Sequence, residues 1–137
     1  MLFRSRDHEL ALPTTVLRPE RDFGGQRFVR HVAADAVWQR SNDGFSFRDL
    51  GIGDATAGLA SVCVLREIAP DLPLMHDGEF LLLYVLAGDM TLRSEAEGAQ
   101  RLFSDDSCVV PAGVAFRLDA EAHCELLEVR LPGMRRV

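Results

Sequence analysis

The chain of 137 residues lacks lysine entirely, because all 15 of its basic residues are arginine. Schiff-base chemistry, a lysine general base and a phosphate-binding P-loop lysine are therefore excluded. Soft and nitrogen metal ligands are also scarce, since the chain has only four His and three Cys. The cysteines form no CxxC pair, and each lies in or beside an apolar segment, so we interpret them as buried free thiols.

Long hydrophobic runs and excess positive charge are missing as well. The longest apolar run, Phe80 to Gly88, is far shorter than the roughly 20 residues that a membrane-spanning helix needs. The first residues, MLFRSRDHELALP, contain no apolar run of the length found in a signal peptide. A formal net charge of -6 argues against binding to phosphate backbones. We therefore expect a cytoplasmic protein without a nucleic-acid partner and without membrane association.

What the chain does contain is a series of short apolar or alternating segments that are typical of strands. They occupy 28–32, 45–50, 60–68, 79–87, 89–93, 100–103, 107–110, 114–118 and 124–131. Gly, Pro, Asn and Asp separate these segments, and only residues 33–39 favour a turn or two of helix. This spacing predicts an all-β sandwich or barrel in a single domain over 26–137. Residues 1–25, which contain Pro13 and Pro19, are interpreted as an irregular N-terminal arm.

The segment EFLLLYVLA (79–87) is apolar on both faces. Its alternation places Leu81, Leu83 and Val85 on one side of the strand, and Leu82, Tyr84 and Leu86 on the other. One side can line a barrel, but the other side needs a second layer or a second copy of the chain. We therefore predict a homodimer.

Two segments resemble the motifs of the cupin superfamily. MHDGEFLLLYVLAGDMTL (75–92) is similar to the first motif, in which HxH precedes a Glu and then a Gly. DDSCVVPAGVAF (105–116) is similar to the second motif, in which PxG precedes a His. The resemblance extends over roughly residues 28 to 132 and is to small bacterial conserved-barrel, RmlC-like cupins. It implies a double-stranded β-helix, that is, a jelly-roll barrel.

The metal-binding positions of the motifs are degenerate in this chain. By resemblance, the four usual ligand positions fall on Leu74, His76, Leu81 and Phe116, so one of the four ligand types is kept. A transition-metal site needs at least three protein ligands. We therefore expect no cofactor. The alternative is one divalent transition metal in a substitute site, for which His76 and Glu79 are the candidate ligands.

The apolar replacements predict a ligand pocket instead of a metal site. We expect the barrel interior at the usual cupin site to be lined by Leu74, His76, Leu81, Leu83, Cys108 and Phe116. That interior is expected to be dry or narrow, and a surviving cavity would take a small apolar or aromatic molecule with His76 as its polar anchor.

Two functions stay open at this point, because a fold does not fix a reaction. The first is a metal-free cupin that binds a small molecule or serves as an interaction or regulatory module without catalysis. The second is a metal-dependent enzyme of the isomerase, lyase or dioxygenase type with an atypical site around His76. The replaced ligands favour the first, and no catalytic residue is assigned.

Overall fold

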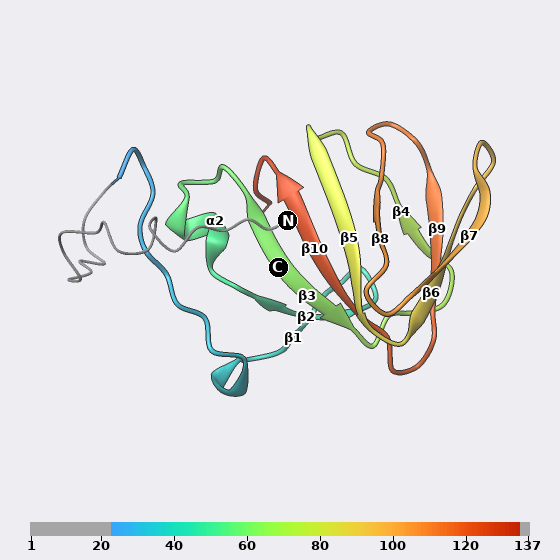
Figure 1. The fold of residues 1–137 in the computed structure, drawn as a ribbon, viewed down its shortest axis with the longest axis horizontal. Coiled ribbons are helices and arrows are strands. Elements are labelled where there is room, and N and C mark those ends of the chain that lie inside the picture. The colour runs from blue at the N-terminus through green and yellow to red at the C-terminus, as the bar shows by residue number, and fades with distance from the viewer. Residues whose placement is uncertain (1–22, 135–137) are drawn as a thin grey trace, which may run out of the picture.

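The computed structural model describes residues 23–134, and within this range ten strands form two antiparallel sheets. The six-stranded sheet has the order β1-β2-β3-β10-β5-β8, and the four-stranded sheet has the order β4-β9-β6-β7. The two sheets face each other across a common hydrophobic core (Figure 1). This arrangement confirms the predicted all-β, single-domain jelly-roll barrel. The predicted arm over 1–25 falls almost wholly outside the described residues.

The elements are short and follow one another closely. The strands are β1 (Gln39–Arg40), β2 (Ser46–Asp49), β3 (Ser61–Arg66), β4 (Leu72–Leu74), β5 (Phe80–Ala87), β6 (Asp89–Ser94), β7 (Gly98–Phe103), β8 (Ser107–Val109), β9 (Phe116–Ala120) and β10 (Glu125–Leu131). A 3-10 turn, η1 (Ala33–Asp35), and a single helical turn, α2 (Ile52–Ala55), complete the described chain. The largest share of the regular structure is thus β-sheet, and no helix among residues 23–134 is long and apolar enough to cross a membrane.

The predicted strands are found with one exception. Eight of the nine predicted segments overlap the observed strands β2, β3 and β5 to β10, whereas the prediction of a strand over 28–32 is wrong. Phe28 and Val29 are exposed there, and the segment belongs to neither sheet. Strand propensity alone does not make a strand, because the backbone also needs a partner edge. The short strands β1 and β4 were not predicted, since two or three residues show no alternation.

The alternation in β5 separates an inner from an outer face, as predicted. Leu81, Leu83 and Val85 are at most 1% exposed and belong to the core between the sheets. The intervening side chains of β5, which include Leu82 and Tyr84, are partly exposed on the outer face. The inner face of β5 therefore lines the barrel interior, next to its neighbours β10 and β8.

Gly88 joins β5 of one sheet to β6 of the other. Its φ of +76° lies in the left-handed region, and a Cβ there would come within 2.9 Å of the Cα of Cys124. Only glycine meets both conditions without strain. The Gly of the first motif is thus required by the turn that closes this corner of the barrel.

Candidate functional site

His76 lies in the loop between β4 and β5, and its side chain is buried. The N–H of Gly78 donates to Nδ1 over 3.2 Å, and Nε2 lies 2.7 Å from the carbonyl oxygen of Val110. Because Nδ1 accepts a hydrogen bond, Nε2 carries the proton and donates it to Val110. The N–H of Gly113 also donates to the carbonyl of His76 over 2.8 Å. His76 therefore ties the β4–β5 loop to the β8–β9 loop, and neither ring nitrogen has a lone pair to offer a metal ion.

The chain directly after His76 packs against the end of β10. The N–H of Glu79 donates to the carbonyl oxygen of Leu131 over 2.8 Å, and a Cβ on Gly78 would lie 2.9 Å from the same oxygen. The side chain of Glu79 is exposed, whereas the ring of His76 is buried. Among residues 23–134, no group of three or more His, Cys, Asp or Glu side chains is placed to hold a metal ion. The His, Cys, Asp and Glu side chains of the described residues therefore do not fit the divalent transition metal that the cupin motifs usually bind.

A cavity of about 350 Å³ opens beside His76, between β4 and β9 of the smaller sheet and the β3–β10–β5 part of the larger sheet. Its apolar wall includes Phe45, Leu65, Leu72, Leu74, Leu83 and Leu118. Its polar lining consists of Asp43, His76, Asp77, Glu128 and Arg130. Apolar walls with a few polar groups are typical of sites that bind small molecules.

The structure brings some of the predicted pocket residues together and leaves others apart. Leu74, His76 and Leu83 line the cavity. Leu81 and Phe116 belong to the buried core, as Leu83 does, but they do not line this cavity, and Cys108 packs partly buried against the core outside it. The barrel interior is therefore filled around Leu81 and Phe116 but open beside Leu74 and Leu83. The prediction of a dry or narrow barrel interior therefore applies only to the part around Leu81 and Phe116.

A buried ion pair lines the cavity, and the sequence reading did not single it out. Glu128 and Arg130 share the inner face of β10 with Leu126, which is fully buried. Arg130 Nη2 lies 3.3 Å from Glu128 Oε2, and the two side chains are only 14% and 4% exposed. Arg130 also has a buried Nε–H without an acceptor among the described residues. The signal in the sequence is the order Leu126-Glu128-Arg130, with charges on the core-facing side of a strand whose other side is apolar.

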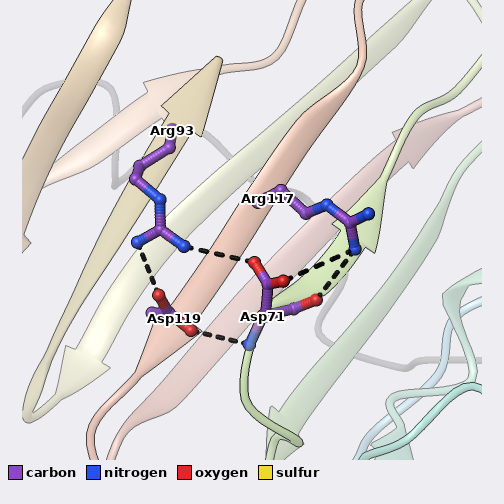
Figure 2. A network of polar contacts seen from close by, with 4 residues as sticks. All are labelled: Asp71, Arg93, Arg117 and Asp119. Carbon is purple, nitrogen blue, oxygen red and sulfur yellow. Dashed lines mark hydrogen bonds and ion pairs between the residues drawn. The ribbon is translucent and has the colours of Figure 1, made fainter.

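The strand β4 forms one wall of the cavity and is held by a polar network (Figure 2). Asp71 precedes β4, and its N–H donates to Asp119 of β9 over 2.6 Å. Arg93 of β6 bridges both carboxylates, with contacts of 3.2 Å to Asp71 and 2.5 Å to Asp119. Arg117 donates to the carbonyl of Asp71 over 3.2 Å. Because β9 is the only described strand that pairs with β4, this network adds a second attachment for the wall.

The same network has an electrostatic consequence at Asp119. The hydrogen bond from Arg93 is the main cause that lowers the pKa of Asp119 below its ordinary value, and the N–H of Asp71 adds to the effect. The pair also raises the pKa of Arg93. Both partners are thus held in their charged forms at neutral pH.

None of the described cysteines has the character of a nucleophile. Burial raises the pKa of Cys108, and burial together with nearby carboxylates raises the pKa of Cys124 to about 11. Cys63 is buried and is in no disulfide bond among the described residues. Because the thiolate is the reactive form, a raised pKa disfavours thiol catalysis at neutral pH.

A larger hollow, of about 630 Å³, lies outside the barrel beside α2. Its lining includes Asp49, Asp54 and four glycines, so much of its wall is backbone. None of the described residues that line it is both buried and charged. We therefore regard the barrel cavity, with its buried ion pair, as the better candidate site.

The comparisons with known proteins agree in fold. No protein-family model and no curated protein matches the chain. KdgF from Halomonas sp. is similar with a TM-score of 0.64 and 19% identity, over 77% of this chain and 94% of that chain. An RmlC-like cupin from Shewanella frigidimarina is similar with a TM-score of 0.61 and 14% identity, over 79% and 94%. A predicted oxalate decarboxylase from Thermotoga maritima has a TM-score of 0.61 and 16% identity, over 75% and 99%. At these identities the likeness concerns the fold and carries no activity across.

Proposed function

We propose that this chain, whose fold is that of the cupins, binds a small organic molecule in its barrel cavity without a metal ion. The observation that carries the proposal is the cavity of about 350 Å³ beside His76. Its volume lies within the range of about 300–1,000 Å³ that is usual for small-molecule sites. A binding role therefore has better support than a purely structural or interaction role.

The arrangement of His76 supports the metal-independent part of the proposal. One ring nitrogen accepts from Gly78 and the other donates to Val110, so a metal ion would have to break a hydrogen bond to bind. Glu79, the other candidate ligand, is exposed. A metal-dependent isomerase, lyase or dioxygenase would need at least three converging ligands.

The lining also indicates how the molecule would be held. The aliphatic wall and Phe45 suit a small apolar or aromatic body. His76 is less suited to be the polar anchor than the sequence indicates, because its ring is already engaged on both sides. Glu128 and Arg130 are the buried polar groups of the lining that can take this role.

The binding proposal can be tested by titrating the ¹⁵N-labelled full chain with a library of small aromatic and aliphatic fragments. We expect amide shifts to concentrate at residues around the cavity, such as Gly78 and Leu74. A Leu83→Phe variant, which fills the cavity from its wall, is expected to abolish these shifts. An Ala99→Val variant, exposed on β7, serves as the control. If no fragment shifts the cavity residues, the binding role is wrong and an interaction module is favoured.

We further propose that the chain is a homodimer through the outer face of the larger sheet. Strand register aligns Val62, Val129, Leu82 and Val109 in one aliphatic row across β3, β10, β5 and β8. Val109 is 57% exposed, so the row continues to the edge of the sheet. Burying such a face against a second copy is favourable in proportion to its apolar area.

Light scattering coupled to size exclusion tests this proposal. We expect a dimer for the native chain and a monomer for Val109→Asp, because a charge in the interface would have to be buried. Phe103→Asp is the matched control, since Phe103 is similarly exposed but lies on β7 of the other sheet. A native monomer at micromolar concentration would contradict the dimer.

A further inference from the structure

The outer face of the larger sheet carries opposite charges at its two ends. Strand register aligns one row of outward side chains from β2 through β3, β10 and β5 to β8: Arg48, Val64, Leu127, Tyr84 and Ser107. The guanidinium of Arg48 therefore stands at one end of the row. At the other end, the hydroxyl of Tyr84 donates to Asp105 Oδ1 over 2.9 Å, which places a carboxylate beside β8. Because neighbouring strands are about 4.8 Å apart, the first and last strands of the row are separated by roughly 19 Å.

Two guanidiniums meet over the ring of Trp38 at the positive end. Cζ of Arg66 lies 3.6 Å from the centroid of the indole ring, and Cζ of Arg48 lies 5.6 Å from it. Arg48 Nη1 also lies 2.9 Å from His31 Nε2, and the imidazole nitrogen accepts this hydrogen bond because a guanidinium can only donate. Within residues 23–134, neither guanidinium forms an ion pair with a carboxylate.

The acids that follow these arginines in the sequence are bound elsewhere. Asp49 Oδ1 accepts from the N–H of Gly51 over 2.7 Å, and Glu67 Oε1 accepts from the hydroxyl of Ser46. At the negative end of the row, Asp105 is exposed and forms no ion pair with an arginine of the described chain. Each end of the outer face thus carries a charge that a second molecule can complement.

We infer that the twofold axis of the homodimer runs along β10, so that Arg48 of each copy pairs with Asp105 of the partner subunit. The inference rests on the proposed homodimer and adds the orientation of its two copies. β10 is the middle strand of the series β2-β3-β10-β5-β8 (Figure 1). A half-turn about an axis along this strand places β2 of one copy over β8 of the other and keeps each row at its own height. The positive end of the row then faces the negative end of the same row in the partner.

The alternative orientation brings like charges together. Sheets that pack face to face keep their strands nearly aligned, so the twofold axis runs either along the strands or across them. An axis across the strands places β2 over the partner's β2, so that guanidiniums face guanidiniums and Asp105 faces its own copy. Like charges that meet across an interface are strongly unfavourable. The opposite charges at the two ends therefore favour the axis along β10.

The sizes of the side chains favour the same axis. At the β2–β3 end, Arg66 and Trp38 stack on each other, whereas β8 presents only the small side chains of Ser107 and Val109 outward. The axis along β10 places the bulky end of one copy over the thin end of the other. An axis across the strands would place the two bulky ends over each other and leave a gap between the two thin ends.

The aliphatic row of the proposed interface also fits this axis. Val129 lies on β10, so it faces its own copy across the axis. Val62 on β3 then lies over Leu82 of the partner subunit, because β3 and β5 flank β10 on its two sides. Apolar side chains thus meet apolar side chains in the centre of the interface, and the charges meet at its ends.

An exchange of charges across the interface tests this inference. The dissociation constant of the dimer is measured by analytical ultracentrifugation of the full chain for the native protein, Arg48→Glu and Asp105→Arg. Each dimer contains the contact twice, so either substitution alone replaces two attractions by two repulsions and should raise the dissociation constant at least about a hundredfold. An equimolar mixture of the two variants restores both attractions. We expect it to form a heterodimer at least about tenfold tighter than the homodimer of either variant.

Matched substitutions on the smaller sheet serve as controls. Arg101 of β7 lies 5.4 Å from the ring of Phe103, so Arg101→Glu also reverses an arginine that stacks on an aromatic ring. Glu97→Arg reverses an exposed acid next to β7. Both should leave the dissociation constant unchanged. Asp105→Asn removes the charge with a residue that, like Asp, tolerates the positive φ of 74°, and it should weaken the dimer about tenfold even where Asp105→Arg prevents folding.

The outcomes separate this inference from the homodimer itself. If the native chain is a monomer at micromolar concentration, the homodimer and the inference are both contradicted. If the native chain is a dimer and the variants at Arg48 and Asp105 dimerise as tightly, the homodimer stands and the axis along β10 is wrong. If Arg48→Glu and Asp105→Arg are monomers and their mixture stays monomeric, the loss does not come from charge pairing, and the inference is overturned.

Discussion

Replacing Glu128 with leucine should destabilise the fold far more than replacing Glu128 and Arg130 together. The two side chains are 4% and 14% exposed, and their charged groups lie 3.3 Å apart. Breaking a buried pair by removing one partner costs about 3–5 kcal/mol, because the remaining charge stays buried. Arg130 keeps some contact with water, so we expect the lower end, about 3 kcal/mol. At roughly 4 °C per kcal/mol for a chain of this size, the melting temperature should fall by about 12 °C.

The double variant Glu128→Leu/Arg130→Leu removes both charges and should lie within about 1 kcal/mol of the native chain. Urea unfolding followed by circular dichroism gives the free energy of unfolding of all four members of this cycle. Glu125→Leu on the same strand is the control and should cost less than about 1 kcal/mol. A loss below about 1 kcal/mol for Glu128→Leu, or a double variant as unstable as the sum of the singles, would contradict the coupling of the two buried charges.

Three further outcomes are expected from the packing and the pKa values. Leu81→Ala should cost about 2–5 kcal/mol of unfolding free energy in urea titrations, since Leu81 is fully buried in the core. Cys124, whose pKa rises from 9.0 to about 11, should have about a hundredfold less thiolate than an ordinary cysteine at pH 8. Iodoacetamide should therefore label it in urea but not in the native state, and rapid native labelling would contradict its burial. Asp119→Asn should lower the melting temperature at pH 7, because Arg93 depresses the pKa of Asp119. The stabilisation by a depressed pKa is complete above the ordinary value of 3.8 and is lost as the pH falls through the folded value. The difference in melting temperature between the native chain and Asp119→Asn should therefore shrink below pH 3.8. A difference in melting temperature that grows below this pH would contradict the stabilisation by Arg93.

The strands of this fold could be predicted where alternation and turn residues coincide. The segments around β5, β6 and β8 are apolar or alternating. Gly88 separates β5 from β6, and β8 ends shortly before Pro111, so these boundaries follow from local chemistry. β4 could not be predicted, because three residues that include Pro73 show no strand pattern and depend on pairing with β9. The segment 28–32 has the composition of a strand but no partner in either sheet. The pairing of two distant segments depends on both of them, so the sequence of one segment alone does not predict it.

The candidate site could be predicted only in part. The motif resemblance indicates which positions fall near the usual cupin site, and Leu74, His76 and Leu83 do line the cavity. It does not indicate how much volume the replaced ligands leave, since Leu81 and Phe116 pack into the core instead. The inward charges of β10 were missed because strand alternation says which residues share a face, but not which face is buried.

Elemental analysis of the full chain, purified without an affinity metal and without chelator, decides between a metal-independent and a metal-dependent cavity. We predict substoichiometric transition metal in the native chain and the same content in His76→Ala, because both ring nitrogens of His76 are used in hydrogen bonds. About one equivalent of a transition metal in the native chain, lost in His76→Ala, would contradict a metal-independent binding protein.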